Sequence, residues 1–318
     1  MPTVHDSTLA RRLASGQLQH IGLLRFSGPD AGAFLQGQVS NDTRRLSAHQ
    51  GLLAAHCSVQ GRVISLLHLL PHSSGIIALL PRDVLLPTIH GLRKFVLRAK
   101  VDIADLSEQF SVIGQHGAEA LRACGLPIPG DADGYVEQAG LGVGRVRAGS
   151  GRYWLIGPSA SLAERGFADG RHDALTVERD WRLADIRAGL PQVYAPSREL
   201  FVPQMLNLDL IDGISFTKGC YTGQEIVART QHLGRIKRRM FRLALPRGNW
   251  AIGQTLRLAD GRAGRLTELA ADDGECEALA VLTIEPGAAD AEVSPSTAVA
   301  ARELPLPYSL PASPGPIR

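Results

Sequence analysis

The stretch KGCYTGQE, residues 218–225, decides how this sequence is interpreted. It places a cation, a thiol, a phenol, an amide, a carboxylate and two glycines close together, between a strand-like run and a helix-like run. Glycines allow backbone conformations that other residues avoid, and they let the backbone approach a ligand closely. So many polar and reactive groups between ordinary flanks indicate a functional loop carried on a rigid base.

Cys220 is the reactive group of this stretch, and its role is open at the level of sequence. It precedes a predicted helix over 221–232 and follows Lys218 by two positions. Free N–H groups at a helix start and a nearby cation both favour a thiolate, which suits a nucleophile, a redox sensor or a soft-metal ligand. An isolated cysteine also serves as a small buried apolar residue. Glu225 is equally open, because a carboxylate in a first helical turn is favourable for structural reasons alone.

The composition is that of a globular chain with two or three domains. Of 318 residues, 44% are hydrophobic and 20% are charged. We expect a cytoplasmic protein without a membrane span, because no apolar run approaches the length that a span requires. Residues 1–100 carry eleven Lys and Arg against four Asp and Glu, whereas 241–318 carry seven against ten. The excess of cations in residues 1–100, here called the basic front, suits an anionic ligand such as a polycarboxylate, a phosphate or RNA. Alternatively, these cations form an ordinary solvated face.

The order of the apolar runs predicts an α+β fold. Strands are expected over four runs in the first hundred residues: 18–26, 52–59, 62–70 and 75–80. The Gln60-Gly61 pair between the second and third runs is typical of a tight hairpin. A helix is expected from Ala31, with Asp30 as its cap.

Two groups of cations accompany predicted helices. Apolar residues at helical spacing predict a helix over 83–98, interrupted or kinked at Pro87. Cations complement the dipole at its end: Arg93, Lys94, Arg98 and Lys100. The second group follows the signature stretch and suits a polycarboxylate, RNA phosphates or a solvated face: Arg229, Arg235, Lys237, Arg238 and Arg239.

The last part of the chain differs from the rest in its sequence pattern. Short strand-like runs separated by glycines predict a small all-β domain over 238–304. The proline-rich residues 305–318 are expected to be a disordered tail. The four cysteines lie far apart and form no C-x-x-C pair, so no permanently bound metal is predicted.

Residues 218–225 resemble the K-G-C-Y-x-G-Q-E signature of the YgfZ family, folate-binding proteins related to the aminomethyltransferase (T protein) of the glycine cleavage system. The likeness extends to FLQGQVSND at 34–42, to FVLRAKV at 95–101 and to IRAGLP at 186–191. These blocks are spread across most of the range 20–240.

The resemblance implies an aminomethyltransferase-like fold. Two interlocked α+β subdomains over 1–237 would surround a folate pocket, followed by a C-terminal β-barrel over 238–304. It also implies a role with tetrahydrofolate in iron–sulfur cluster assembly or repair and, through iron–sulfur enzymes, in tRNA modification. Catalytic roles are then expected for Cys220 and Lys218. Folate contacts are expected from nine residues: Gln38, Asn41, Asp42, Asp185, Arg187, Tyr221, Gly223, Gln224 and Glu225.

One position departs from the pattern of the related folate enzymes. Where these carry a glutamate in an E-A-G element, this sequence has Arg187. A guanidinium cannot accept the pterin N–H groups that a carboxylate accepts. Either Asp185 or another acid takes this role, or folate binds differently or weakly.

Three functions therefore compete. The first is a folate-binding accessory protein with transient iron–sulfur enzyme or assembly partners, in which Cys220 handles a thiol or cluster intermediate. The second is an aminomethyltransferase that transfers a one-carbon unit to tetrahydrofolate. The third is an RNA-binding protein that uses the basic front, although aromatic residues make up only 5% of the chain.

Overall fold

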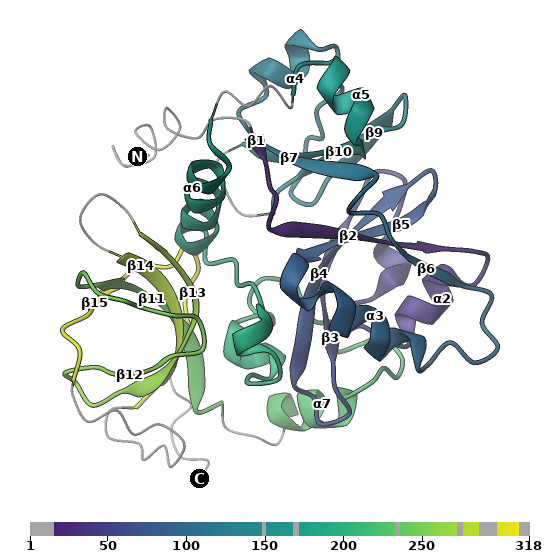
Figure 1. Ribbon diagram of the computed structural model, residues 1–318. Helices are drawn as coiled ribbons and strands as arrows, with labels where there is room; N and C mark the ends of the chain where they lie inside the picture. The colour runs from purple at the N-terminus through teal and green to yellow at the C-terminus, as the bar shows by residue number, and fades with distance from the viewer. Residues whose placement is uncertain are drawn as a thin grey trace. The chain divides into compact units, whose positions relative to one another are not determined.

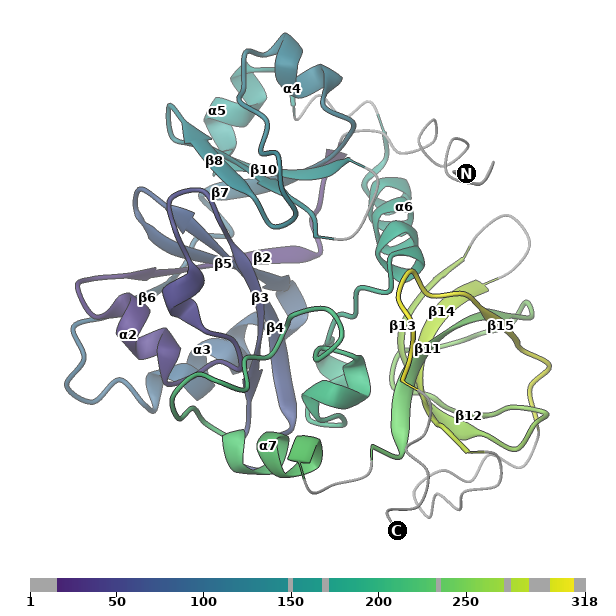
Figure 2. The same ribbon diagram turned by 180° about the vertical axis from the view of Figure 1, so that it is seen from behind.

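The part of the chain that the structure describes folds into three five-stranded sheets and a set of helices (Figures 1 and 2). The computed structural model describes residues 16–147, 151–167, 172–232, 236–271, 276–285 and 298–311. The strand pairs whose register is resolved are antiparallel. The predicted α+β fold class is confirmed.

Two compact units divide the chain. The first comprises residues 1–38, 42–54 and 67–181, and the second comprises 39–41, 55–66 and 182–318. The second unit therefore takes two short pieces from the first hundred residues. The predicted boundary between 237 and 238 stays a prediction, since both sides of it fall in the second unit.

The first unit contains a complete sheet with the strand order β1-β7-β10-β9-β8. The bounds of these strands are Gly16–Gln17, Phe110–His116, Arg152–Pro158, Leu141–Arg145 and Tyr135–Gln138, in that order. Helices α4 (Glu119–Ala123) and α5 (Ser159–Glu164) place Leu121 and Leu162 in one apolar core with Ile113 and Leu155 of the sheet. Burial of these side chains is what holds such short helices, which are unstable alone.

A second sheet has the strand order β3-β4-β5-β2-β6. Its strands are Leu52–Cys57, Val63–His72, Gly75–Pro81, Ile21–Ser27 and Asp102–Asp105, in that order. Every residue of β3 is buried, so this strand is covered on both faces. The predicted hairpin is confirmed, and Gly61 in its turn has a φ of +68°, which favours glycine.

Two helices accompany the second sheet, α2 (Ala31–Gln36) and α3 (Leu85–Arg93). The predicted helix over 83–98 is thus shorter at its C-terminal end. Pro87 lies in the first turn, where a missing N–H breaks no intrahelical bond, so the expected interruption does not occur. Asp30 is the N-cap residue of α2, as predicted, but its side chain accepts no hydrogen bond from the first turn. Its Oδ2 instead accepts the backbone N–H of Lys100 at 2.7 Å.

The third sheet belongs to the second unit and has the order β12-β13-β14-β11-β15. Its strands are Thr255–Arg257, Ala263–Ala271, Cys276–Thr283, Arg238–Leu245 and Arg302–Leu304, in that order, as expected for the all-β region. Leucines from several strands form its core, among them Leu243, Leu256, Leu266 and Leu282. An isolated bridge pairs Leu258 with Val299. Closure of this sheet into a barrel stays a prediction.

The other elements within the described ranges are helices α6 (Ala174–Arg187) and α7 (Gln224–His232) and four 3-10 helices, Thr43–Arg45, Arg82–Val84, Ala195–Ser197 and Pro203–Leu206. Of the tail predicted to be disordered, residues 305–311 are described by the structure. Tyr308 donates its hydroxyl to the Gly189 carbonyl at 2.9 Å. Residues 312–318 lie outside the described residues.

Candidate functional site

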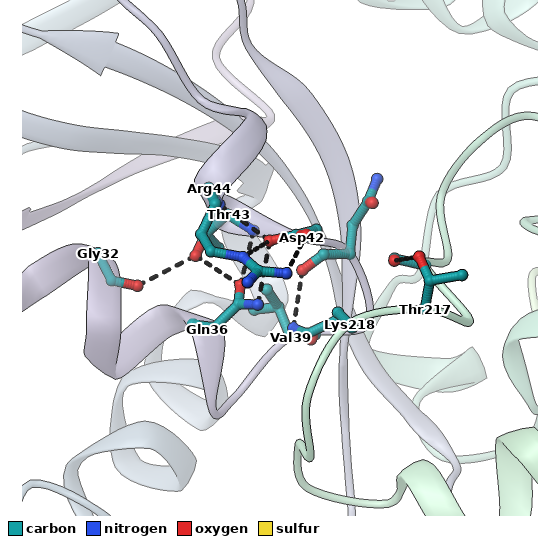
Figure 3. A network of polar contacts seen from close by, with 10 residues as sticks. Gly32, Gln36, Val39, Asp42, Thr43, Arg44, Thr217 and Lys218 are labelled. Atoms are coloured by element: carbon teal, nitrogen blue, oxygen red, sulfur yellow. Dashed lines mark hydrogen bonds and ion pairs between the residues drawn. The ribbon is translucent and has the colours of Figure 1, made fainter.

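Lys218 is buried, with 5% of its surface exposed, and its ammonium group is fully engaged (Figure 3). Nζ donates to the carbonyl oxygens of Val39 at 2.7 Å and Asn41 at 2.8 Å. It also lies 5.0 Å from the centroid of the Tyr221 ring. A buried cation requires such acceptors to offset its lost hydration. Lys218 therefore ties the signature stretch to segment 39–41.

Segment 39–41 is held from the other side as well. Ser40 donates Oγ to the Gly213 carbonyl at 2.7 Å and accepts the N–H of Ala55 at 2.8 Å. Asn41 donates Nδ2 to the carbonyl of Asp212 at 2.7 Å and is fully buried. Hydrogen bonds thus join two blocks that lie more than 170 residues apart in sequence, close to the start of the signature stretch.

Gly223 fixes the other end of the stretch against the β3–β4 hairpin turn. Its φ is +82°, and a Cβ atom there would lie 2.4 Å from the carbonyl oxygen of Ser58. Gly61 also faces this end of the stretch, because a Cβ atom there would lie 2.8 Å from Cβ of Ile226 in α7 and 3.2 Å from the carbonyl oxygen of Gly223. Figure 1 shows α7 at the tip of this hairpin. Glycine at both positions is what allows the two backbones to touch.

The start of α7 combines two reciprocal contacts. Gln224 accepts the Tyr221 N–H through its side-chain Oε1 at 3.2 Å, and its own N–H donates to the Tyr221 carbonyl at 3.1 Å. The helix begins at Gln224, three residues later than predicted, and Glu225 occupies its first turn as expected. Tyr221 is buried, which raises the pKa of its phenol, while Glu225 is exposed. Gln224 thus has a structural task at the helix start.

Cys220 differs from the other cysteines in its exposure. Cys57 and Cys276 are buried and Cys124 is half-buried, whereas Cys220 is exposed. Burial raises the pKa of the Cys57 thiol to about 12, so this group stays protonated. Cys220 is the thiol that a partner can reach, on a loop anchored at both ends.

Asp42 and its neighbours form hydrogen bonds in the first unit (Figure 3). Arg44 donates Nε and Nη2 to the two carboxylate oxygens of Asp42 at 2.9 and 2.7 Å, and Gln36 donates Nε2 at 3.0 Å. Hydrogen bonding from Arg44 holds the pKa of Asp42 well below its usual range. Gln38, in the same unit, is buried. Folate contacts by Asp42 and Gln38 stay predictions.

Arg187 forms an ion pair with the third sheet. It donates Nε and Nη2 to Oε1 of Glu277 in β14 at 2.8 and 2.5 Å. Arg242 of β11 occupies the other carboxylate oxygen, at 3.0 and 2.6 Å. One carboxylate thus bridges two guanidinium groups. The residue that replaces the expected glutamate joins the end of α6 to the sheet.

A second ionic cluster was not anticipated from the sequence. Arg182 of α6 donates Nε to Oε1 of the fully buried Glu268 at 2.8 Å and lies 4.9 Å from the Tyr194 ring centroid. Burial raises the pKa of Glu268 from 4.5 to about 7, against the opposing effects of Arg182 and Tyr194. Asp185, a predicted folate contact, is buried and adds its charge to this cluster. The sequence offers no signal for this cluster, because Arg182 and Glu268 lie 86 residues apart. The register of β13 against β14 also shifts between Leu266 and Glu268, so strand alternation does not indicate which face Glu268 occupies.

The cations downstream of the stretch have unequal environments. Arg239 is buried and forms two parallel bonds with Asp209, at 2.6 and 2.8 Å. Its guanidinium group is therefore occupied by a structural ion pair and does not contribute to the predicted anion-binding group. Lys237 and Arg229 are exposed, and Arg235 lies outside the described residues.

Among the described residues, no three His, Cys, Asp or Glu side chains gather in a way that could hold a metal ion. No helix in the described ranges has the length and apolar character needed to cross a membrane.

Comparison with known proteins places the chain. No family model matches it. It is 39% identical over 222 residues to the tRNA-modifying protein YgfZ of Edwardsiella ictaluri (strain 93-146), a match that covers 69% of this chain and 67% of that protein. The YgfZ protein of Colwellia psychrerythraea (strain 34H / ATCC BAA-681) is 33% identical over 277 residues, 84% of each chain.

A solved structure shares the fold at low sequence identity. The glycine cleavage system aminomethyltransferase T from Bartonella henselae superposes with a TM-score of 0.68 at 17% identity, over 87% of this chain and 80% of that one. The predicted relation to the T protein is thus confirmed at the level of fold. With relatives above 30% identity along most of their length, this chain belongs to the YgfZ family.

Proposed function

We propose that this chain is a tetrahydrofolate-binding accessory protein that supports tRNA modification by iron–sulfur enzymes, with Cys220 as its working thiol. Membership of the YgfZ family and the T-protein fold support this. The observation that carries the proposal is the exposed thiol on a loop fixed by Lys218 at one end and Gly223 at the other. Such anchoring holds a reactive group in a constant geometry while leaving it accessible to a partner.

The buried acids suit the pterin part of folate better than Arg187 does. A pterin presents N–H donors, which require acceptors such as carboxylate oxygens. Arg187 carries donors only and is paired with Glu277. Asp185 and Glu268 are buried carboxylates of the same cluster and are the acids to hold a pterin. Bound folate would supply a carrier for one-carbon units.

The second candidate is an aminomethyltransferase, favoured by the fold shared with the T protein. The two functions differ in their need for the thiol. Aminomethyl transfer to folate uses carboxylate chemistry and requires no cysteine. This function therefore does not explain why a thiol is exposed at Cys220. An accessory role in iron–sulfur metabolism explains it, because thiolates are the usual ligands of such clusters.

The experiment replaces the chromosomal gene with Cys220→Ala and measures the activity of an iron–sulfur tRNA-modifying enzyme in the same cells. We expect activity to fall to the level of the gene deletion while the purified variant unfolds like wild type. Cys124→Ala, at a half-buried thiol, is the matched control and should support full activity. Full activity of Cys220→Ala would overturn the thiol role. Formation of methylenetetrahydrofolate from an aminomethyl donor by that variant would favour the transferase.

A further inference from the structure

Segment 84–101 presents a surface that the folate proposal does not use. It comprises helix α3 and the loop that follows it, and it lies entirely within the first unit. The segment contains no Asp or Glu. It contains four cations: Arg93, Lys94, Arg98 and Lys100. Its charge is therefore uncompensated within the segment.

The four cations are exposed. Arg93 donates Nη2 to the carbonyl oxygen of Ile103 at 2.9 Å, a contact that leaves its charge unneutralised. In the described parts of the chain, no side-chain ion pair engages Lys94, Arg98 or Lys100. Asp83 and Asp102 flank the segment in sequence, and Oδ2 of Asp102 lies 3.5 Å from Nη2 of Arg25. These side chains are available to an anionic ligand.

Apolar side chains are exposed among the same cations. Leu86, Phe95 and Leu97 are 60%, 41% and 86% exposed, and they are three of the five large apolar side chains exposed within the described ranges. Their concentration in one short segment departs from the scattered pattern of an ordinary surface. Exposed apolar groups rimmed by charge mark interaction sites.

Both ends of the exposed loop are fixed. At one end, α3 buries Leu85, Ile89 and Leu92. At the other end, Lys100 donates its N–H to Asp30 Oδ2 at 2.7 Å, and its carbonyl accepts the Asp30 N–H at 3.3 Å. The backbone is therefore held while its cations and apolar groups project outward. A fixed presentation lowers the entropic cost of binding a ligand.

We propose that residues 86–100 bind single-stranded RNA. The cations would contact phosphates, which are the dominant source of affinity for nucleic acid. Phe95 and Leu97 would pack against base faces, as aromatic and apolar side chains do in single-strand sites. The preponderance of cations over acids throughout residues 1–100, eleven against four, favours a polyanion over an acidic protein patch. This surface is independent of Cys220 and of folate.

The test measures the fluorescence anisotropy of a labelled twelve-residue oligouridine titrated with the full chain at several salt concentrations. The variant combines Lys94→Ala, Arg98→Ala and Lys100→Ala. Each lost phosphate contact lowers the salt slope by about 0.7, so a reduction of about 2 is expected, with affinity at least about tenfold weaker. The matched control combines Arg122→Ala, Arg165→Ala and Arg257→Ala, three exposed cations outside both predicted cation groups, and should bind like wild type.

A second variant separates stacking from charge. Phe95→Leu keeps an apolar side chain but removes the ring, so binding should weaken about tenfold with an unchanged salt slope. Absence of oligouridine binding by wild type at low salt would overturn the proposal, as would tight binding that the triple variant leaves unchanged. Binding of wild type to phosphatidylserine vesicles without binding to oligouridine would assign the surface to anionic lipid instead and equally overturn it.

Discussion

At the residue scale, Lys218 and Cys220 have opposite environments although they are two positions apart. The ammonium group is buried on two backbone carbonyls, and the thiol is exposed. The sequence correctly indicates a special loop, but it cannot indicate the burial of Lys218. The carbonyls that make this burial possible lie 177 and 179 residues away in sequence, so no local pattern reports them.

Replacing Lys218 with Met tests whether its ammonium group clamps the signature stretch to segment 39–41. Lys218→Met keeps the apolar stem but leaves the carbonyls of Val39 and Asn41 buried without their donor. Hydrogen bonds to charged groups contribute about 1.5–3 kcal/mol each, so the free energy of unfolding should fall by about 3 kcal/mol. Urea titration followed by circular dichroism measures this. Cys220→Ala, at an exposed position, should change it by less than about 0.5 kcal/mol, and equal effects of the two substitutions would contradict the clamp.

At the scale of elements, the contact between α7 and the β3–β4 hairpin turn determines where the signature loop lies. The sequence predicts both elements, because the hairpin has its Gln60-Gly61 turn and the helix has its acidic first turn. It places the helix start three residues early, since it cannot show that Gly223 adopts a positive φ before the helix. That conformation follows from the tertiary contact with Ser58.

Two glycines of the same loop provide a matched comparison. Gly223→Ala forces a Cβ to within 2.4 Å of the Ser58 carbonyl oxygen at a φ of +82°. Left-handed strain and overpacking together should lower the free energy of unfolding by about 2–4 kcal/mol. Gly219→Ala has ordinary backbone geometry, and among the described residues no atom lies within 4 Å of its added Cβ. It should be neutral in the same urea titration, and a neutral Gly223→Ala would refute the close contact.

The ionic link between α6 and β13 predicts a pH dependence. Glu268 has its pKa raised from 4.5 to about 7, so the folded protein binds this proton more tightly than the unfolded chain. Its contribution to stability is therefore complete below pH 4.5 and is lost as pH rises through 7, a change of about 3 kcal/mol.

The uncharged variant Glu268→Gln isolates this contribution. The loss of the Arg182 counter-ion adds an offset that does not vary with pH, because the guanidinium stays charged throughout. The free energy of unfolding of wild type minus that of Glu268→Gln should therefore decline as pH rises from 4.5 to 7. Urea titrations at a series of pH values measure the difference. A difference that is flat, or that rises with pH, contradicts the raised pKa.

At the scale of the whole molecule, the sequence predicts the α+β class, the all-β region and the family. These depend on strand periodicity and on motifs that are continuous in sequence. Arg187 shows where such prediction ends. Its pairing with Glu277 joins residues 90 positions apart, and nothing near Arg187 in sequence identifies its partner. The arginine in place of the glutamate is thus accommodated by the sheet.

The most direct test of the central claim is calorimetric titration of the purified chain with tetrahydrofolate under anaerobic conditions. We predict saturable binding at one site, weakened at least about tenfold by Asp185→Asn and by Glu268→Gln, because each removes carboxylate acceptors for pterin N–H groups. Cys220→Ala should bind like wild type, because the thiol is not assigned to pterin recognition. Absence of any binding heat from the wild-type chain at folate concentrations found in cells would contradict the account.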